Sequence, residues 1–281
     1  ILGLAYPILL QVIARLDEKY ESENIASLFK TEWEWKAFQY SLIGALIALL
    51  IWALNLKPLF QFDGFNWFIN NSAKLILLTS AIILVLSFFF FVNKVLKYYT
   101  PYSIIPYLVT RHEKSNSHVA FFPALADLLL LSIRRQQTNL GKTLSDFFYT
   151  AFKKVREEHA SEPVVYPDQN YEVVHKAIEE LAILKEKRNY LLEHRTSGGV
   201  WLIGEMQEKK ISDKTYQWLW HNLLLAVRYK QDDLVINHWE TCHQYISYHL
   251  QPINQEFDYS DSTFQVSIQE EVEERNADRS R

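Results

Sequence analysis

The stretch AFQYSLIGALIALLIWALNL, from Ala37 to Leu56, is about 20 residues long and contains no charged side chain. A helix of that length rises about 30 Å, which is the thickness of the hydrocarbon core of a bilayer. A second uncharged stretch, LILLTSAIILVLSFFFFV, runs from Leu75 to Val92, and lysines flank both stretches. Together they predict two transmembrane helices; the alternative is a pair of buried helices in a soluble protein.

A third apolar stretch, ILGLAYPILLQVI, opens the chain from Ile1 to Ile13 and is too short to cross a bilayer. We interpret it as part of a first transmembrane helix whose start is missing. A re-entrant segment and a signal sequence are the alternatives, and the signal sequence fits less well because no small-residue cleavage site follows. Residues 1–93 are therefore predicted to form a transmembrane domain with two to three spans.

Residues 14–36 are predicted to form an amphipathic helix between the first and second apolar stretches. Its apolar side chains recur at helical spacing, with glutamates on the opposite side. They are Ile25, Leu28, Phe29 and Trp33. Such a helix lies on the inner membrane surface or docks on the cytosolic domain.

The distribution of lysine and arginine predicts the orientation of the chain. Residues 14–36 and residues 94–114 each hold four basic side chains, whereas the loop of residues 57–74 has them only at its two ends. This short loop is therefore expected outside, and the C-terminal region in the cytoplasm. The single cysteine, Cys242, fits a reducing compartment.

Neither long apolar stretch contains an ionisable residue, which argues against a proton relay or a transporter with a substrate site at the midplane. A pore built from several copies of the chain and a plain membrane anchor remain. The hydroxyl side chains within the stretches are the candidates for lining such a pore, and ordinary helix packing is the alternative. These candidates are Ser41, Thr79, Ser80 and Ser87.

Residues 94–255 are predicted to form an α-helical cytosolic domain, because apolar residues recur at helical spacing and Pro or Gly mark the turns. The predicted helices cover residues 101–112, 119–137, 140–159, 169–195, 198–208, 212–230 and 232–250. The last two form an antiparallel hairpin of the kind repeated in tetratricopeptide-like solenoids. The predicted fold class is all-α: two to three transmembrane helices followed by a helical-hairpin bundle, with or without solenoid character. Residues 256–281 are predicted to be an acidic tail or linker.

Charge excludes one class of function. The chain has 29 Lys and Arg against 33 Asp and Glu, so its net charge of −4 argues against a non-specific binder of duplex nucleic acid. A local site for a nucleotide or oligonucleotide ligand is still allowed, because some basic side chains lie near aromatic ones that stack on bases. Solvated helix faces are the alternative. The basic candidates are Arg134, Arg135, Lys153, Lys154 and Arg156, and the aromatic residues are Phe147, Phe148, Tyr149, Phe152 and Tyr190.

The sequence contains no convincing catalytic motif. The tripeptide GKT at 141–143 resembles the end of a phosphate-binding loop, but Gln136 stands where that motif has glycine. His238, Cys242 and His249 share a helix face, but interleaved aromatic residues are typical of an amphipathic helix with a buried cysteine. We therefore predict that the chain is not an enzyme and has no cofactor and no metal site.

The block LAYPILLQVIARLDEKY, from Leu4 to Tyr20, followed by two spans and a helical cytosolic region, is similar in layout to the channel-type effectors of the Hailong anti-phage defence family. In that family a membrane channel is opened or held shut by nucleic-acid signals bound on its cytosolic side. The resemblance implies a bacterial inner (plasma) membrane protein and supplies no residue roles.

These observations favour an oligomeric membrane effector whose spans form an ion channel or pore around a symmetry axis. A ligand or partner bound to the cytosolic helices would gate it. The alternative is a membrane-anchored helical scaffold that recruits a soluble protein partner.

Overall fold

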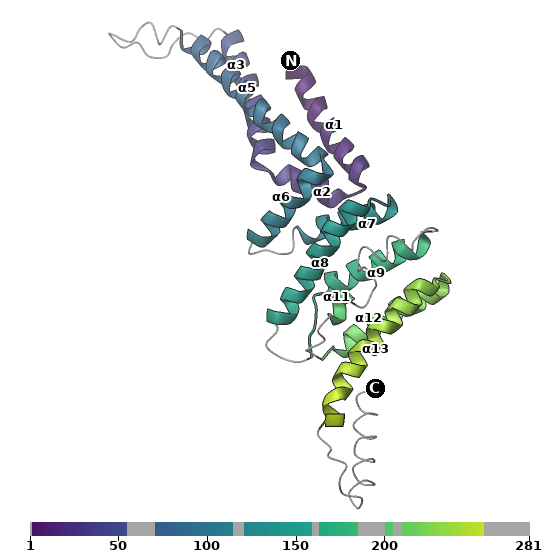
Figure 1. Cartoon of the computed structure of the whole chain (residues 1–281). Coiled ribbons are helices and arrows are strands. Elements are labelled where there is room, and N and C mark those ends of the chain that lie inside the picture. Colours follow the sequence, from purple (N-terminus) through teal and green to yellow (C-terminus); the bar gives the residue numbers. More distant parts are fainter. Residues whose placement is uncertain are drawn as a thin grey trace, which may run out of the picture. The chain divides into compact units, whose positions relative to one another are not determined.

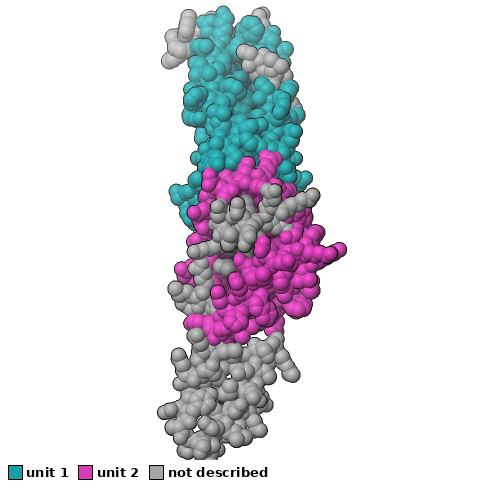
Figure 2. Space-filling model, turned by 45° about the vertical axis from the view of Figure 1, so that its right-hand side comes forward, with its two compact units in different colours: residues 1–131 teal, residues 132–281 magenta. Residues whose placement is uncertain are grey.

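The computed structural model describes residues 2–54, 71–114, 121–158, 163–184, 200–204 and 210–255. In these ranges the chain folds into eleven helices and no strand, with one isolated bridge between Val164 and Ile211 (Figure 1). The predicted all-α class is therefore confirmed. Residues Ile1–Leu131 and Ser132–Arg281 form two compact units (Figure 2).

Helices α3 (Trp33–Ala53) and α5 (Ser72–Tyr99) are the two described helices that are long and apolar enough to cross a membrane. They lie side by side in the first unit (Figure 1). Apolar side chains that face away from the pair are exposed, which is compatible with a lipid environment. They include Ile43, Ile47 and Leu50 on α3 and Ile82, Val85 and Phe89 on α5.

An aromatic cluster closes one end of the α3–α5 pair. Phe91 of α5 is fully buried, and its ring centroid lies 4.9 Å from that of Phe38 in a stacked arrangement. The rings of Trp35 and Phe29 lie 6.0 and 6.1 Å from it. These contacts fix how the two helices pack at this end, because interlocked rings leave little freedom to rotate.

The prediction of one amphipathic helix over residues 14–36 is wrong in extent. Helix α1 (Leu2–Tyr20) ends just before Glu21, which has a φ of 49°, and α2 (Glu23–Thr31) begins two residues later. The Ser22 hydroxyl accepts a hydrogen bond from the Ile25 amide at 3.2 Å, which caps α2 and starts the new helix. The apolar face of α2 is buried as expected, and Phe29 packs against the aromatic cluster of α3 and α5.

The first unit also contains α6 (Pro101–Lys114) and most of α7 (Phe122–Arg134). Leucines on α7 are fully buried, including Leu125, Leu128 and Leu129. Packing divides the chain at Leu131, whereas the predicted boundary at residue 93 follows the end of the second apolar stretch. The predicted outer loop lies mostly outside the described residues.

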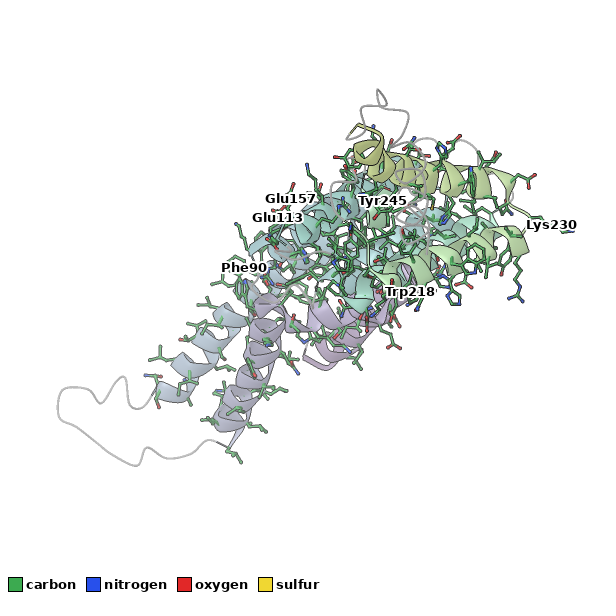
Figure 3. The ribbon with its side chains drawn as sticks, turned by 90° about the horizontal axis from the view of Figure 1, so that it is seen from below. Phe90, Glu113, Glu157, Trp218, Lys230 and Tyr245 are labelled. Carbon is green, nitrogen blue, oxygen red and sulfur yellow. The ribbon has the colours of Figure 1, made fainter. Side chains whose placement is uncertain are left out.

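The second unit is built from α8 (Thr138–Glu158), α9 (Asp168–Ile183), α11 (Val200–Ile203), α12 (Asp213–Arg228) and α13 (Asp232–Gln255). The predicted hairpin of residues 212–250 is present as α12 and α13, with Lys230 in the turn between them (Figure 3). Within the described ranges, the predicted helix over 198–208 corresponds to the short helix α11, and Gly204 lies beyond its end. The helix predicted over 169–195 ends at Ile183, and residues 185–199 and the tail at 256–281 lie outside the described ranges.

The hairpin buries only part of the apolar face that its sequence predicts. Leu219 and Ala226 of α12 and Leu234 and Tyr245 of α13 are buried. Apolar residues beside them are exposed instead, because each helix carries apolar side chains on more than one side. These exposed residues are Leu224, Val227, Trp239 and Ile246.

Candidate functional site

A buried carboxylate lies where α2 ends and α3 begins. Glu32 caps both helices in an extended conformation, with φ −63° and ψ 141°, and it is only 2% exposed. A buried charge of this kind is costly unless several groups compensate it. The residues around Glu32 therefore form the candidate functional site.

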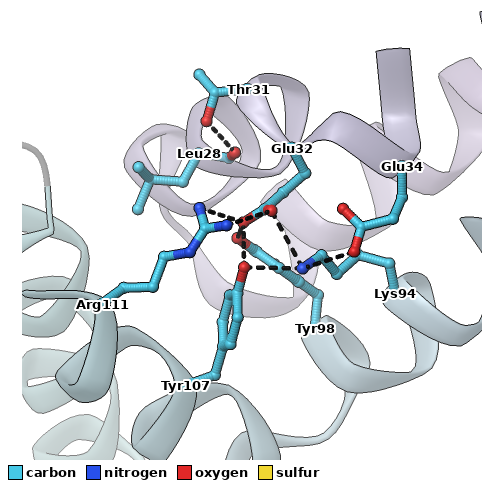
Figure 4. Close-up of polar contacts among 8 residues, drawn as sticks. All are labelled: Leu28, Thr31, Glu32, Glu34, Lys94, Tyr98, Tyr107 and Arg111. Atoms are coloured by element: carbon cyan, nitrogen blue, oxygen red, sulfur yellow. Dashed lines mark hydrogen bonds and ion pairs between the residues drawn. The ribbon is translucent and has the colours of Figure 1, made fainter. Parts of the chain in front are cut away.

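Two tyrosines and two cations surround the Glu32 carboxylate (Figure 4). The hydroxyls of Tyr98 and Tyr107 each donate a hydrogen bond to Oε1 at 2.7 Å. Lys94 Nζ lies 3.1 Å from Oε2, and Arg111 Nη2 lies 3.4 Å from the same oxygen. Both carboxylate oxygens are therefore engaged by positive or donating groups.

Lys94 extends this cluster to a second carboxylate. Its ammonium lies 3.1 Å from Glu34 Oε1 and donates to the Tyr107 hydroxyl at 2.7 Å. Lys94 is 8% exposed, so its charge is almost as buried as that of Glu32. Two acids and two bases make the cluster formally neutral, which is the arrangement that a buried ionic group requires.

The cluster keeps Glu32 ionised. Burial alone would raise its pKa, but the hydrogen bonds from Tyr107 and Tyr98 and the ammonium of Lys94 outweigh that effect and lower the pKa of Glu32 below its ordinary value. Burial raises the pKa of Tyr107, so this tyrosine stays protonated and donates. An ionised carboxylate with a lowered pKa is a weak general base, and its protonated donors hold it in a fixed position.

We name Glu32, Glu34, Lys94, Tyr98, Tyr107 and Arg111 the junction cluster. Its members come from three places: the start of α3, the end of α5 and helix α6. The cluster therefore fastens the ends of the two apolar helices to the first helix that follows them. The cluster was not predicted, because Lys94 in the sequence looks like a basic residue that flanks a span and sets its orientation. The available signal was the pairing of a cation and a tyrosine four residues apart on both α5 and α6.

The structure brings together two of the four predicted pore-lining hydroxyls. Ser41 Oγ and Ser87 Oγ lie 2.5 Å apart between α3 and α5, and Ser87 is 8% exposed. Ser80 donates to the Leu77 carbonyl of its own helix at 2.9 Å, and Thr79 is exposed. The Ser41–Ser87 contact supports the helix-packing alternative for these two residues, and pore lining by any of the four stays a prediction.

The five predicted ligand-binding cations have separate surroundings. Arg134 forms an ion pair with Glu180 at 2.6 Å, and Arg135 is exposed. Lys153 and Lys154 are exposed and lie 3.7 and 3.6 Å from glutamates one turn along α8. Such exposed pairs contribute little to stability, so these two lysines are the more available members of the group.

Arg156 is used inside the second unit. Its Nη1 donates to the Trp201 carbonyl at 2.6 Å and to the Tyr166 hydroxyl at 3.1 Å. Its guanidinium also lies against Gly204, whose φ is 84° and where an added Cβ would come within 2.9 Å of Arg156 Cζ. Arg156 therefore holds the short α11 segment in place.

The predicted stacking residues are in part core residues. Phe148 and Phe152 are fully buried, and their ring centroids lie 5.5 and 5.9 Å from that of Trp201. They are not available to a nucleobase, so this part of the prediction is wrong. Tyr149 and Phe147 are half-buried, and Tyr190 lies outside the described ranges.

Arg156→Ala is expected to lower the free energy of unfolding by about 2 kcal/mol, because hydrogen bonds from a charged group are lost and two acceptors are left behind. Lys154 is exposed on the same helix, so Lys154→Ala should change the free energy of unfolding by less than about 0.5 kcal/mol. Thermal unfolding of both variants measures the difference. Equal effects would contradict the structural role of Arg156.

Burial shifts the pKa values of two side chains on α13, His238 and Cys242. Burial lowers the pKa of His238 to about 4 and raises the pKa of the Cys242 thiol to about 11. The thiol is therefore protonated at neutral pH and is a poor nucleophile. Within the described ranges, no group of three His, Cys, Asp or Glu side chains is placed to hold a metal ion.

His238 makes stability depend on pH. Its folded-state pKa of about 4 lies below the unfolded value of about 6.5, so the unfolded chain binds the proton first. The stabilisation is complete above pH 6.5 and is lost as the pH falls toward 4, by an amount on the order of 3 kcal/mol. His238→Gln should flatten the unfolding profile in this window. An unchanged slope would show that the imidazole is not buried in its neutral form.

Comparison of the chain with protein-family models, with curated proteins and with solved structures finds no match to any of them.

Proposed function

We propose that the chain is an oligomeric membrane effector in which α3 and α5 of several copies form an ion channel or pore. A ligand or partner on the cytosolic helices gates it through the junction cluster. The observation that carries the proposal is that cluster, because it ties the ends of both apolar helices to α6 by buried, charged contacts. A plain anchor has no use for so costly a connection.

The exposed apolar faces of α3 and α5 support assembly. Two helices enclose no pore by themselves, and symmetric assembly is the usual way to build one from few helices. Residues such as Ile47 and Val85 are more than half exposed, so lipid or a neighbouring copy must cover them.

Gating is a shift between two arrangements of the cytosolic ends of the helices. In one arrangement Tyr107 and Arg111 of α6 hold the Glu32 carboxylate; in the other they release it. A ligand that binds one arrangement better than the other shifts the equilibrium between them by the ratio of its two affinities. Location in a bacterial inner membrane and a role in anti-phage defence are proposed on the resemblance of layout.

A nucleotide or oligonucleotide is the ligand class that we propose, with Lys153 and Lys154 as its contacts. Arg156 is left out because its hydrogen bonds hold α11. Binding of an oligonucleotide should weaken steeply with salt, and the double substitution K153Q/K154Q should reduce the slope of log affinity against log salt by up to about 2. An unchanged slope would place the ligand elsewhere.

The channel is tested with Tyr107→Phe. Loss of this hydroxyl removes one donor to Glu32 and one acceptor of Lys94, so the arrangement in which α6 holds Glu32 weakens and ion flux into vesicles containing the purified protein should change. Tyr102→Phe is the matched control, because that tyrosine lies on the same helix and is 68% exposed. Native mass spectrometry gives the copy number. A monomer without ion flux in any variant would overturn the channel.

A scaffold is the second candidate, and exposed aromatic residues on α12 and α13 favour it. Trp220 and Trp239 are 61% and 66% exposed, which is unusual for residues of this size. The double variant W220A/W239A should then lose a co-purifying protein partner while keeping membrane association. Retention of the partner by this variant would exclude these two residues as its binding site.

A further inference from the structure

A cleft lies between α1 and the end of α5. It has a volume of about 230 Å³ and is lined by Ile8, Gln11, Val12 and Arg15 of α1 and by Tyr99 of α5. Gln11, Arg15 and Lys19 recur every four residues, so they lie on one side of α1. One end of the cleft is apolar and the other carries a guanidinium.

Two hydrogen bonds fix the level of this cleft along α5. Lys19 Nζ donates to the Tyr99 carbonyl, and Tyr20 donates to the Tyr98 carbonyl, each at 2.6 Å. Tyr99 lies seven residues beyond Val92, the end of the apolar stretch, or about 10 Å along the helix. Lys19 lies at the level of Tyr99, and Arg15 lies one helical turn closer to the apolar stretch. Arg15 is therefore about 5 Å outside the hydrocarbon core, at the depth of lipid headgroups.

Arg15 is available for a ligand. It is exposed, and no hydrogen bond or ion pair joins its guanidinium to another residue in the described part of the chain. Asp17 and Glu18, the nearest acids along α1, do not line the cleft. Lys19, one turn farther from the hydrocarbon, adds a second positive charge and lies 4.2 Å from the centroid of the Tyr99 ring.

We propose that this cleft binds the phosphodiester headgroup of an anionic phospholipid. Arg15 pairs with the phosphate, Gln11 supplies a further hydrogen bond, and Ile8 and Val12 contact the start of an acyl chain. Arginine suits this role because its planar fork matches phosphate geometry and its charge cannot be lost. The inference rests on the membrane location in the proposed function and is independent of the channel.

The test measures phosphatidylglycerol that stays bound to the full chain in native mass spectra after extraction from vesicles of phosphatidylglycerol and phosphatidylcholine. Arg15→Gln should reduce bound phosphatidylglycerol about tenfold, because a hydrogen bond from a charged group at the site contributes about 1.5 kcal/mol. Lys36→Gln removes the same charge from exposed α3 surface outside the cleft and should change it less than about twofold. Val12→Phe should reduce it while Arg15 is retained, because the larger ring fills the apolar end.

Equal losses in Arg15→Gln and Lys36→Gln would overturn the site, because the lipid would then respond only to overall charge. Displacement of the lipid by inorganic phosphate would also overturn it, since the cleft would then bind free phosphate rather than a lipid. Membrane fractionation of the wild type separates the two proposals. A protein absent from membranes contradicts the proposed function, whereas a membrane protein whose Arg15→Gln variant binds lipid normally contradicts this site alone.

Discussion

Glu32→Ala is expected to lower the free energy of unfolding by about 3–5 kcal/mol, because the cluster then holds two cations, Lys94 and Arg111, against the single carboxylate of Glu34. Tyr98, which is fully buried, also loses the acceptor of its hydroxyl. At about 2–4 °C per kcal/mol for a domain of this size, the unfolding midpoint in detergent should fall by about 10 °C. A fall of only a degree or two would mean that water reaches the junction cluster.

Two further variants separate charge from packing at Glu32. Glu32→Gln keeps the shape and the acceptor for the tyrosine hydroxyls but removes the charge, so its loss should be intermediate. The double variant E32L/K94M removes both charges and should lose less than the sum of the single changes. Additive losses would contradict a direct ionic contact between Glu32 and Lys94.

The effect of Glu32 also has a defined pH dependence. Because its pKa is lowered in the folded protein, its contribution is present above the ordinary unfolded value and is lost as the pH falls through the folded value. The wild type should therefore lose more stability on acidification than Glu32→Gln does. The His238 effect is common to both proteins and cancels in the comparison.

Phe152→Ala is expected to have an effect of similar size in the second unit. Phe152 is fully buried, and its ring lies 5.4 Å from Tyr166 and 5.9 Å from Trp201, measured between centroids. Truncation leaves a cavity that rigid aromatic neighbours cannot fill, which costs about 3–5 kcal/mol. Thermal unfolding followed by tryptophan fluorescence measures the loss.

Phe147→Ala is the matched control for Phe152→Ala. Phe147 lies on the same helix but is only half-buried, so its truncation should cost less than half as much. Similar losses in the two variants would show that burial does not decide the stability of α8. If Phe152 contacted a nucleotide instead, its substitution would weaken ligand binding while the unfolding midpoint stayed unchanged.

The apolar helices and the terminal hairpin could be predicted from the sequence because their signals are local. The uncharged stretches 37–56 and 75–92 correspond closely to α3 and α5, and Ser212 marks the start of α12 by its cap. The breaks around α2 could not be predicted in the same way. The apolar spacing continues across the second break, from Ile25 to Trp33. At the first break the residue with a positive φ is Glu21, and a glutamate gives no sequence signal for that conformation.

The junction cluster could not be predicted because its contacts are long-range. Glu32 is separated from Tyr98 by 66 residues and from Tyr107 by 75. Each residue, taken alone, resembles a charge or an aromatic side chain at a membrane border. For the basic residues of α8, the spacing in the sequence suggested a common site. In the structure Arg156 donates a hydrogen bond to α11, whereas Lys153 and Lys154 lie at the surface.

The junction cluster also sets the order in which a newly made chain can mature. Arg111 follows Glu32 by 79 residues, so both apolar helices have been synthesised before the last group that holds the carboxylate is added. Until then Glu32 keeps its hydration shell, because half of its compensating donors do not yet exist. The junction cluster therefore closes only after α6 has been synthesised, and α6 completes the contacts at these ends of α3 and α5.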